Sequence, residues 1–210
     1  MTPQSAIDER DGAVVDAMAS WINGRPVPPF IEIVHRFGLS RAGFNLRLDL
    51  FHQRDHAIRS FGFAIPSAEL LDALAQRAPV LEIGAGTGYM TALMRNRGID
   101  VVGTDLRTFD YGFKHGSLDS KQLILGGPSA VKDHADRTVF CSWPSLGEDW
   151  FLHSLKEMIP GQRLIVVRES ACADDATWEY LESKFEPDEL NIPIPVWPGM
   201  HDTAEAWSKK

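Results

Sequence analysis

The chain has 210 residues and a formal net charge of −8, a length that suits one domain, or one domain with an extension. Hydrophobic residues make up 44% and charged residues 24%, which is the composition of an ordinary globular protein. The acidic balance argues against a general nucleic-acid binder, because such proteins present a basic face to the phosphate backbone. We therefore expect a small-molecule partner rather than a nucleic acid.

The two cysteines, Cys141 and Cys172, form neither a disulfide framework nor a metal-binding motif. We see no secretory leader and no apolar run long enough to cross a bilayer. These features favour a cytoplasmic protein, and they leave its oligomeric state undefined.

Residues 1–60 lack strand alternation and are predicted to form a helical extension, whose amphipathic segment 44–61 packs on the main domain. His52 and His56 are four residues apart, a spacing that suits metal ligands on a helix. The glutamate of an H-E-x-x-H motif is missing, however, and no third ligand is evident. We expect a polar helix surface there and no metal.

Residues 61–210 are predicted to form a single domain in which strands and helices alternate. Ser67 is placed to cap a helix over 68–78, with Glu69 in its first turn. Further along the chain, strands are expected at 80–83, 100–105, 122–125, 138–142 and 163–169, and helices at 88–98, 145–159 and 174–185.

Ser145 and Glu148 have the spacing of a capping box, which places the start of the helix over 145–159. Two short final segments, 192–196 and 204–208, are predicted to form a hairpin around W-P-G-M-H-D. The whole pattern predicts an α/β fold: a mostly parallel sheet with helices on both faces and a C-terminal antiparallel hairpin.

The segment V-L-E-I-G-A-G-T-G-Y-M, residues 80–90, places three glycines directly after an apolar strand. A nicotinamide or flavin site of the Rossmann type expects G-x-G-x-x-G, whereas the spacing here is G-x-G-x-G. Glu82 precedes the first glycine by two residues, and Asp105 ends the next predicted strand. The alternative is an ordinary glycine-rich turn, with Asp105 as a strand-end cap.

The segment E-I-G-A-G-T-G resembles motif I of the class I S-adenosylmethionine (SAM) methyltransferases. This resemblance implies a Rossmann-like fold and SAM as cofactor, with Gly84, Ala85 and Gly86 along its methionine and ribose portions. It also implies that Glu82 favours the ammonium group, while the Asp105 carboxylate can accept both ribose hydroxyls. The cofactor-binding residues expected on this basis are Ser67, Glu82, Gly84, Ala85, Gly86, Gly88, Tyr89, Asp105, Leu106, Ser129 and Ser142.

A narrower resemblance covers the chain from about Phe51 to Trp207. The segments 61–69, 139–145 and 195–202, together with E-I-G-A-G-T-G-Y, are similar to those of a poorly characterised methyltransferase-like group with C-x-W-P and W-P-G-x-H-D segments. This chain departs from the group at Ser145, where a second proline is usual, and at R-E-S-A-C-A-D-D, where glycines are usual. The resemblance identifies a cofactor and leaves the acceptor open.

Candidate acceptor residues follow the strand 138–142, because ligands gather at the carboxyl ends of strands in open α/β sheets. Amino-methylating relatives place [DNS]-P-P-[YFW] there; Ser142 and Pro144 match that pattern in part, and Trp143 does not. Trp143 is expected either to pack in a structural turn or to stack on the acceptor or the sulfonium. His201 is a further candidate, with a surface histidine as the alternative.

The sequence therefore predicts a SAM-dependent methyltransferase that acts on an unidentified acceptor, a small molecule methylated on nitrogen or oxygen. The alternative is a SAM-binding protein without turnover, a sensor or a structural subunit. The spacing of acidic and histidine residues does not mark a catalytic base.

Overall fold

The computed structural model describes residues 62–64, 66–86, 88–106, 123–194, 196 and 200–210. The predicted extension over residues 1–60, with His52 and His56, lies outside the described residues. No helix in the described part of the chain is both long enough and apolar enough to cross a membrane.

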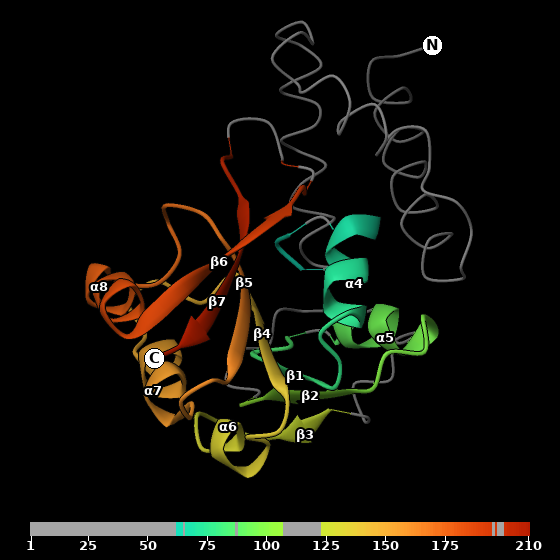
Figure 1. Ribbon diagram of the computed structural model, residues 1–210, viewed down its shortest axis with the longest axis horizontal. Coiled ribbons are helices and arrows are strands. Elements are labelled where there is room, and N and C mark those ends of the chain that lie inside the picture. Colours follow the sequence, from blue (N-terminus) through green and yellow to red (C-terminus); the bar gives the residue numbers. More distant parts are fainter. Residues whose placement is uncertain (1–61, 65, 87, 107–122, 195, 197–199) are drawn as a thin grey trace, which may run out of the picture.

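A seven-stranded sheet forms the centre of the molecule, with the strand order β3-β2-β1-β4-β5-β7-β6 (Figure 1). Five strands are parallel: β1 (Val80–Ile83), β2 (Val101–Asp105), β3 (Ile124–Leu125), β4 (Thr138–Ser142) and β5 (Arg163–Arg168). The last two strands, β6 (Phe185–Ile192) and β7 (Thr203–Lys209), pair antiparallel with each other, and β7 pairs antiparallel with β5.

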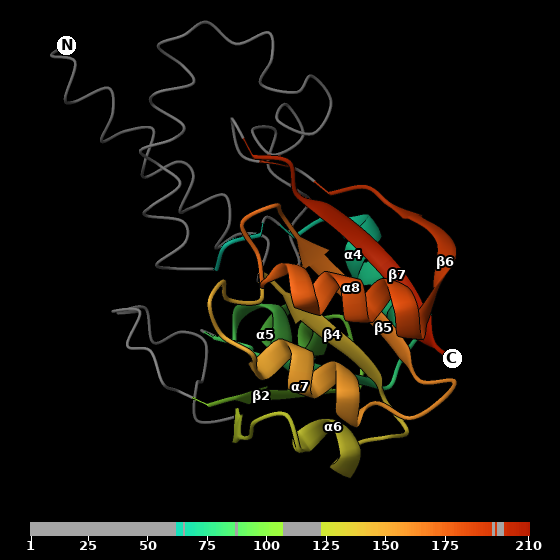
Figure 2. The same cartoon turned by 90° about the vertical axis from the view of Figure 1, so that its left-hand side faces the viewer.

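Helices cover both faces of this sheet (Figure 2). Two lie on one face, α4 (Ala68–Ala75) and α5 (Tyr89–Asn96), and three on the other, α6 (Ala130–Asp133), α7 (Trp150–Glu157) and α8 (Asp175–Lys184). The predicted fold class, a Rossmann-like α/β fold with a mostly parallel sheet and a C-terminal antiparallel hairpin, is confirmed.

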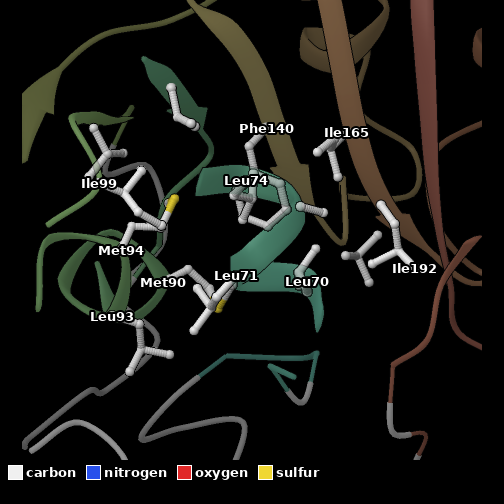
Figure 3. Close-up of a cluster of buried hydrophobic side chains, with 14 of the residues drawn as sticks. Leu70, Leu71, Leu74, Met90, Leu93, Met94, Ile99, Phe140, Ile165 and Ile192 are labelled. Atoms are coloured by element: carbon white, nitrogen blue, oxygen red, sulfur yellow. The ribbon is translucent and has the colours of Figure 1, made fainter. Parts of the chain in front are cut away.

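The central strands are continuous apolar runs in the sequence because successive side chains of a strand point to opposite faces of the sheet, and each face is covered by a hydrophobic core. In β5, Ile165 and Val167 pack under α4 and α5, whereas Leu164 and Val166 pack under α7 and α8. Figure 3 shows the first core, in which side chains of α4 and α5 meet those of the central strands; it includes Leu70, Leu71, Leu74, Met90, Leu93, Met94, Phe140 and Ile165.

Ser67 caps α4 as the sequence predicts. Its Oγ accepts the Leu70 N–H at 3.0 Å, which satisfies one of the unpaired amides of the first turn. The same hydroxyl donates to the Pro193 carbonyl at 2.8 Å and so joins the start of α4 to the segment after β6.

Two predicted boundaries are wrong. Helix α7 begins at Trp150 rather than Ser145, because Gly147 forms a turn at φ +75° and its N–H donates to Asp174 Oδ1 at 3.2 Å. The Ser145–Glu148 capping box is therefore not formed. Strand β6 begins at Phe185, not near Ile192; it is an exposed edge strand, and its polar residues give no apolar alternation to detect.

Candidate functional site

The strand order reverses between β1 and β4, and this reversal locates the site. From β1 the chain proceeds outward to β2 and β3, and from β4 it proceeds the other way to β5. Ile83 pairs in register with Thr104 of β2 and with Cys141 of β4, so the three strands end level with one another. In open α/β sheets, ligands bind beyond the carboxyl ends of the strands at such a switch point.

A cavity lies at this edge of the sheet. The glycine loop after β1 supplies its floor, β2 and β3 supply one wall, and the segment from β4 into α7 supplies the opposite wall. The first part, in β1 and the glycine loop, comprises Glu82, Ile83, Gly84, Ala85 and Gly86. The β2 and β3 wall comprises Asp105, Leu106, Gly126 and Gly127, and the opposite wall comprises Ser142, Trp143, Ser145, Glu148, Trp150 and Ser154. Residues 62–64 and Met90 also line the cavity.

Asp105 organises the glycine loop from the end of the neighbouring strand. Its Oδ2 accepts the Gly86 N–H at 2.8 Å, and the Ala85 N–H donates to the Thr104 carbonyl at 2.9 Å. The loop needs glycine because Gly84 and Gly86 have φ angles of +63° and +52°, in the left-handed region that other residues avoid.

The two glycines differ in what surrounds them. A Cβ on Gly84 would lie 2.7 Å from the Trp150 ring, so this glycine makes room for the tryptophan of α7. A Cβ on Gly86 would meet nothing within 4 Å. Gly86 therefore presents bare backbone to open space in the cavity, which is where a ligand can approach the main chain closely.

Glu82 is a buried carboxyl group, only 3% exposed, on the sheet face covered by α5. Its pKa is raised to about 8, chiefly by burial and in addition by the nearby charge of Asp105, while a hydrogen bond from the Thr91 hydroxyl opposes the rise. Glu82 is therefore largely protonated at neutral pH, and a cation bound beside it would favour its ionised form.

Trp143 follows β4 in an unusual backbone conformation, with φ +56°, which is rare for a large side chain. Its N–H donates to the Val167 carbonyl at 2.9 Å. Its ring stacks on Phe63, with centroids 5.2 Å apart and planes inclined by 14°. Together the two rings form an aromatic part of the cavity wall.

Eight of the predicted residues line the cavity: Glu82, Gly84, Ala85, Gly86, Asp105, Leu106, Ser142 and Trp143. Four other residues that were predicted to bind the cofactor do not line the cavity: Ser67, Gly88, Tyr89 and Ser129. Ser67 is occupied as a helix cap, and Ser129 is an exposed residue at the start of α6. Gly88 precedes α5, where an added Cβ would lie 3.3 Å from the Leu123 side chain, and Tyr89 is 1% exposed in the first core.

The predicted acceptor residues Pro144 and His201 also lie outside the lining. Pro144 is buried, and its carbonyl accepts the Ala173 N–H at 3.0 Å. The His201 side chain is 86% exposed, with Nδ1 3.9 Å from Glu169 Oε1. The placement of His201 agrees with the surface histidine that was the alternative.

The sequence reasoning missed several lining residues, among them Phe63, Gly126, Gly127, Glu148 and Trp150. The glycine pair directly after β3 was a usable signal, because glycine at a strand end permits close approach of a ligand. Glu148 had been assigned to a helix cap. Trp150 could not be distinguished from the other apolar residues of the predicted helix over 145–159. Among the described residues, no cluster of histidine, cysteine and carboxylate side chains could hold a metal.

No protein-family model matches the chain, and no curated protein matches it. Solved structures with a similar fold include a TehB-like SAM-dependent methyltransferase from Corynebacterium glutamicum, 17% identical, with 79% of this chain and 100% of that chain covered and a TM-score of 0.48. A second is the 1,6-didemethyltoxoflavin N1-methyltransferase of Burkholderia thailandensis with bound S-adenosylhomocysteine, 18% identical, with 79% and 87% covered and a TM-score of 0.46.

A third is the glycopeptide N-methyltransferase MtfA in complex with S-adenosylhomocysteine, 15% identical, with 82% of this chain and 95% of that chain covered and a TM-score of 0.47. At such identities and TM-scores, the similarity concerns the fold. The ligand and the reaction of this chain have to be argued from its own residues.

Proposed function

We propose that this protein is a SAM-dependent methyltransferase that methylates a small molecule on nitrogen or oxygen. One observation carries the proposal: at the switch point of the sheet, Asp105 holds the Gly86 amide, and Gly86 presents open space to the cavity. A glycine loop tied to the end of the second strand is a suitable cradle for a nucleoside-containing ligand.

The two walls of the cavity suit the two ends of SAM. Asp105, Leu106, Gly126 and Gly127 lie on the β2 and β3 side, where a carboxylate and bare backbone fit a ribose and a flat base. Glu82 lies in β1 just before the glycine loop, where burial raises its pKa and a bound cation would stabilise its ionised form. We assign the ammonium group of SAM to the neighbourhood of Glu82 and the adenosine to the β2 and β3 side.

When bound, SAM supplies a methyl group activated by the adjacent sulfonium charge. The residues of this chain then have to align the acceptor and exclude water. The β4 to α7 wall is the part of the cavity that the cofactor assignment leaves for the acceptor. An amine or hydroxyl acceptor must also lose a proton there, to a carboxylate such as Glu148 or to water.

The test has two stages. Isothermal titration of the full chain with SAM, S-adenosylhomocysteine and NADH should show binding of the two SAM compounds only. Methyl-labelled SAM is then incubated with the protein and a small-molecule extract, and mass spectrometry identifies any compound that gains the label. Binding of NADH alone would overturn the proposal, and SAM binding without transfer to any fraction would favour a SAM-binding protein without turnover.

A further inference from the structure

We propose that the acceptor is a small organic cation, an amine that is protonated in solution, and that Glu148 is the residue that selects it. This inference rests on the proposed function, because it assigns a substrate class to the part of the cavity left over beside SAM. Three observations support it: the sign of the charges in the cavity, the state of Glu148, and the aromatic wall.

Every ionisable side chain among the described residues that line the cavity is acidic, and none is basic. These side chains are Glu82, which is buried and largely protonated in the free protein, Asp105 and Glu148. Such a lining disfavours phosphorylated or carboxylated acceptors, since like charges repel inside a cavity where water screens them poorly. It favours a positively charged ligand.

Glu148 differs from the other two carboxyl groups. Glu82 is hydrogen-bonded to Thr91, and Asp105 accepts the Gly86 amide. Glu148 forms no hydrogen bond or ion pair with any residue in the described part of the chain, although it is half-buried in the cavity wall. A half-buried carboxylate is stabilised when a cation sits beside it, so Glu148 fits a ligand charge that the protein itself does not supply.

The cavity that Glu148 lines also has aromatic walls. Trp150 lies two residues further along and packs on Gly84, and Trp143 stacks on Phe63 with centroids 5.2 Å apart. Aromatic rings attract ammonium groups through their negative faces, and sites for alkylated ammonium ions combine rings with a carboxylate. The φ angle of +56° at Trp143 shows that the surrounding fold holds this ring in place against a backbone cost, a pattern often found at ligand sites.

The sulfonium and ammonium charges of SAM are the competing occupants of this acidic cavity. S-adenosylhomocysteine has no sulfonium charge, and its ammonium group is assigned beside Glu82. In protein saturated with S-adenosylhomocysteine, a second ligand therefore reports on the part of the cavity assigned to the acceptor, the β4 to α7 wall. Two probes of nearly equal shape then differ in charge: choline, which is cationic, and 3,3-dimethyl-1-butanol, which is neutral.

Titration of the saturated protein, followed by ligand-observed NMR and calorimetry, should show choline binding about tenfold or more tightly than the neutral alcohol. Glu148→Gln should bring the two affinities together while leaving S-adenosylhomocysteine binding unchanged. Glu157→Gln is the matched control, because Glu157 is an exposed carboxylate at the end of α7 and does not line the cavity. This control should keep the preference, and thermal denaturation should show that both variants fold.

Equal affinities for choline and the alcohol in protein that binds S-adenosylhomocysteine would overturn the inference and leave the proposed function intact. A preference that survives Glu148→Gln would overturn the role of Glu148. Failure of S-adenosylhomocysteine to bind at all would overturn the proposed function, and with it the assignment of this wall to an acceptor.

Discussion

The Gly86 N–H donates a hydrogen bond of 2.8 Å to Oδ2 of Asp105, and so joins the loop after β1 to the end of β2. The two residues are 19 positions apart in the chain. This bond gives Asp105 a structural task in addition to any contact with a ribose. A carboxylate oxygen has two acceptor sites, so one side chain can hold the loop amide and still accept ligand hydroxyls.

Asp105→Ala should weaken SAM binding by about tenfold to a hundredfold or more, because hydrogen bonds to a charged group contribute roughly 1.5–3 kcal/mol. Since Asp105 also holds Gly86, part of the loss should persist with a SAM analogue lacking both ribose hydroxyls. Calorimetry of both proteins with both ligands separates the two contributions as a double-mutant cycle. Full-strength binding of SAM by the variant would show that the ribose lies elsewhere.

Gly86→Val should abolish SAM binding and leave the domain folded, because the branched side chain would occupy the open space that faces this glycine. Gly98→Val is the matched control. Gly98 also has a positive φ, +74°, and nothing within 4 Å of an added Cβ, but it does not line the cavity. Both variants should lose about 1–3 kcal/mol of stability through backbone strain. If both variants bind SAM equally well by calorimetry, the glycine loop is not the site.

Glu82 should make the free protein less stable as the pH rises. Its pKa is about 8 in the folded state against an ordinary value of 4.5, so between these pH values the folded state holds a proton that the unfolded state has lost. The free energy of unfolding therefore falls as the pH rises through this window, by an amount on the order of a few kcal/mol. Urea unfolding of wild type and Glu82→Gln at several pH values measures the difference. Glu69→Gln, an exposed change on α4, should behave like wild type.

Because the Glu82 carboxyl group is largely protonated in the free protein, we expect SAM binding to release protons near neutral pH. A cationic ammonium group beside Glu82 would lower its pKa, so a carboxyl group that is protonated in the free protein would ionise in the complex. Calorimetry in two buffers of different ionisation enthalpy, phosphate and Tris, measures the proton count directly. Glu82→Gln should bind without this release, and equal release by wild type and variant would place the ammonium group away from Glu82.

Lys209 near the C-terminus should stabilise the packing of α7, α8 and β7. Its Nζ donates to the Leu155 carbonyl at 2.5 Å and to the Tyr180 hydroxyl at 3.2 Å, and it lies 5.2 Å from the centre of the Phe185 ring. Cations near the last carbonyls of a helix are favourable, and Lys209 is partly shielded from water.

Lys209→Met should lower the free energy of unfolding by roughly 1–3 kcal/mol, since the partners of the ammonium group remain partly buried. Lys210→Met is the control, because the Lys210 ammonium makes one exposed contact of 3.4 Å with the Ser183 carbonyl. Chemical denaturation should show a much smaller change for Lys210→Met. Equal losses in the two variants would mean that the Lys209 contacts contribute little.

The sequence alone determined the parts of this protein that depend on local pattern. Apolar runs marked the central strands, because residues of a parallel sheet are buried on both faces. The G-x-G-x-G spacing marked the loop after β1, and Asp105 stood at the end of a recognisable strand. The polar edge strand β6 and the start of α7 escaped detection, because one lacks an alternating pattern and the other depends on a turn at Gly147.

Only the tertiary structure decided which side chains share the cavity. Phe63 precedes the glycine loop in the chain, whereas Glu148 and Trp150 lie close together well after it. Glu148 and Trp150 reach the cavity because the sheet order brings β4, and α7 after it, beside β1. Ser67 and Tyr89 lie close to that loop in sequence, yet a helix cap and the first core engage them instead. Spacing along the chain specifies an element and its exposed positions, whereas the packing of elements against one another selects the residues that face a ligand.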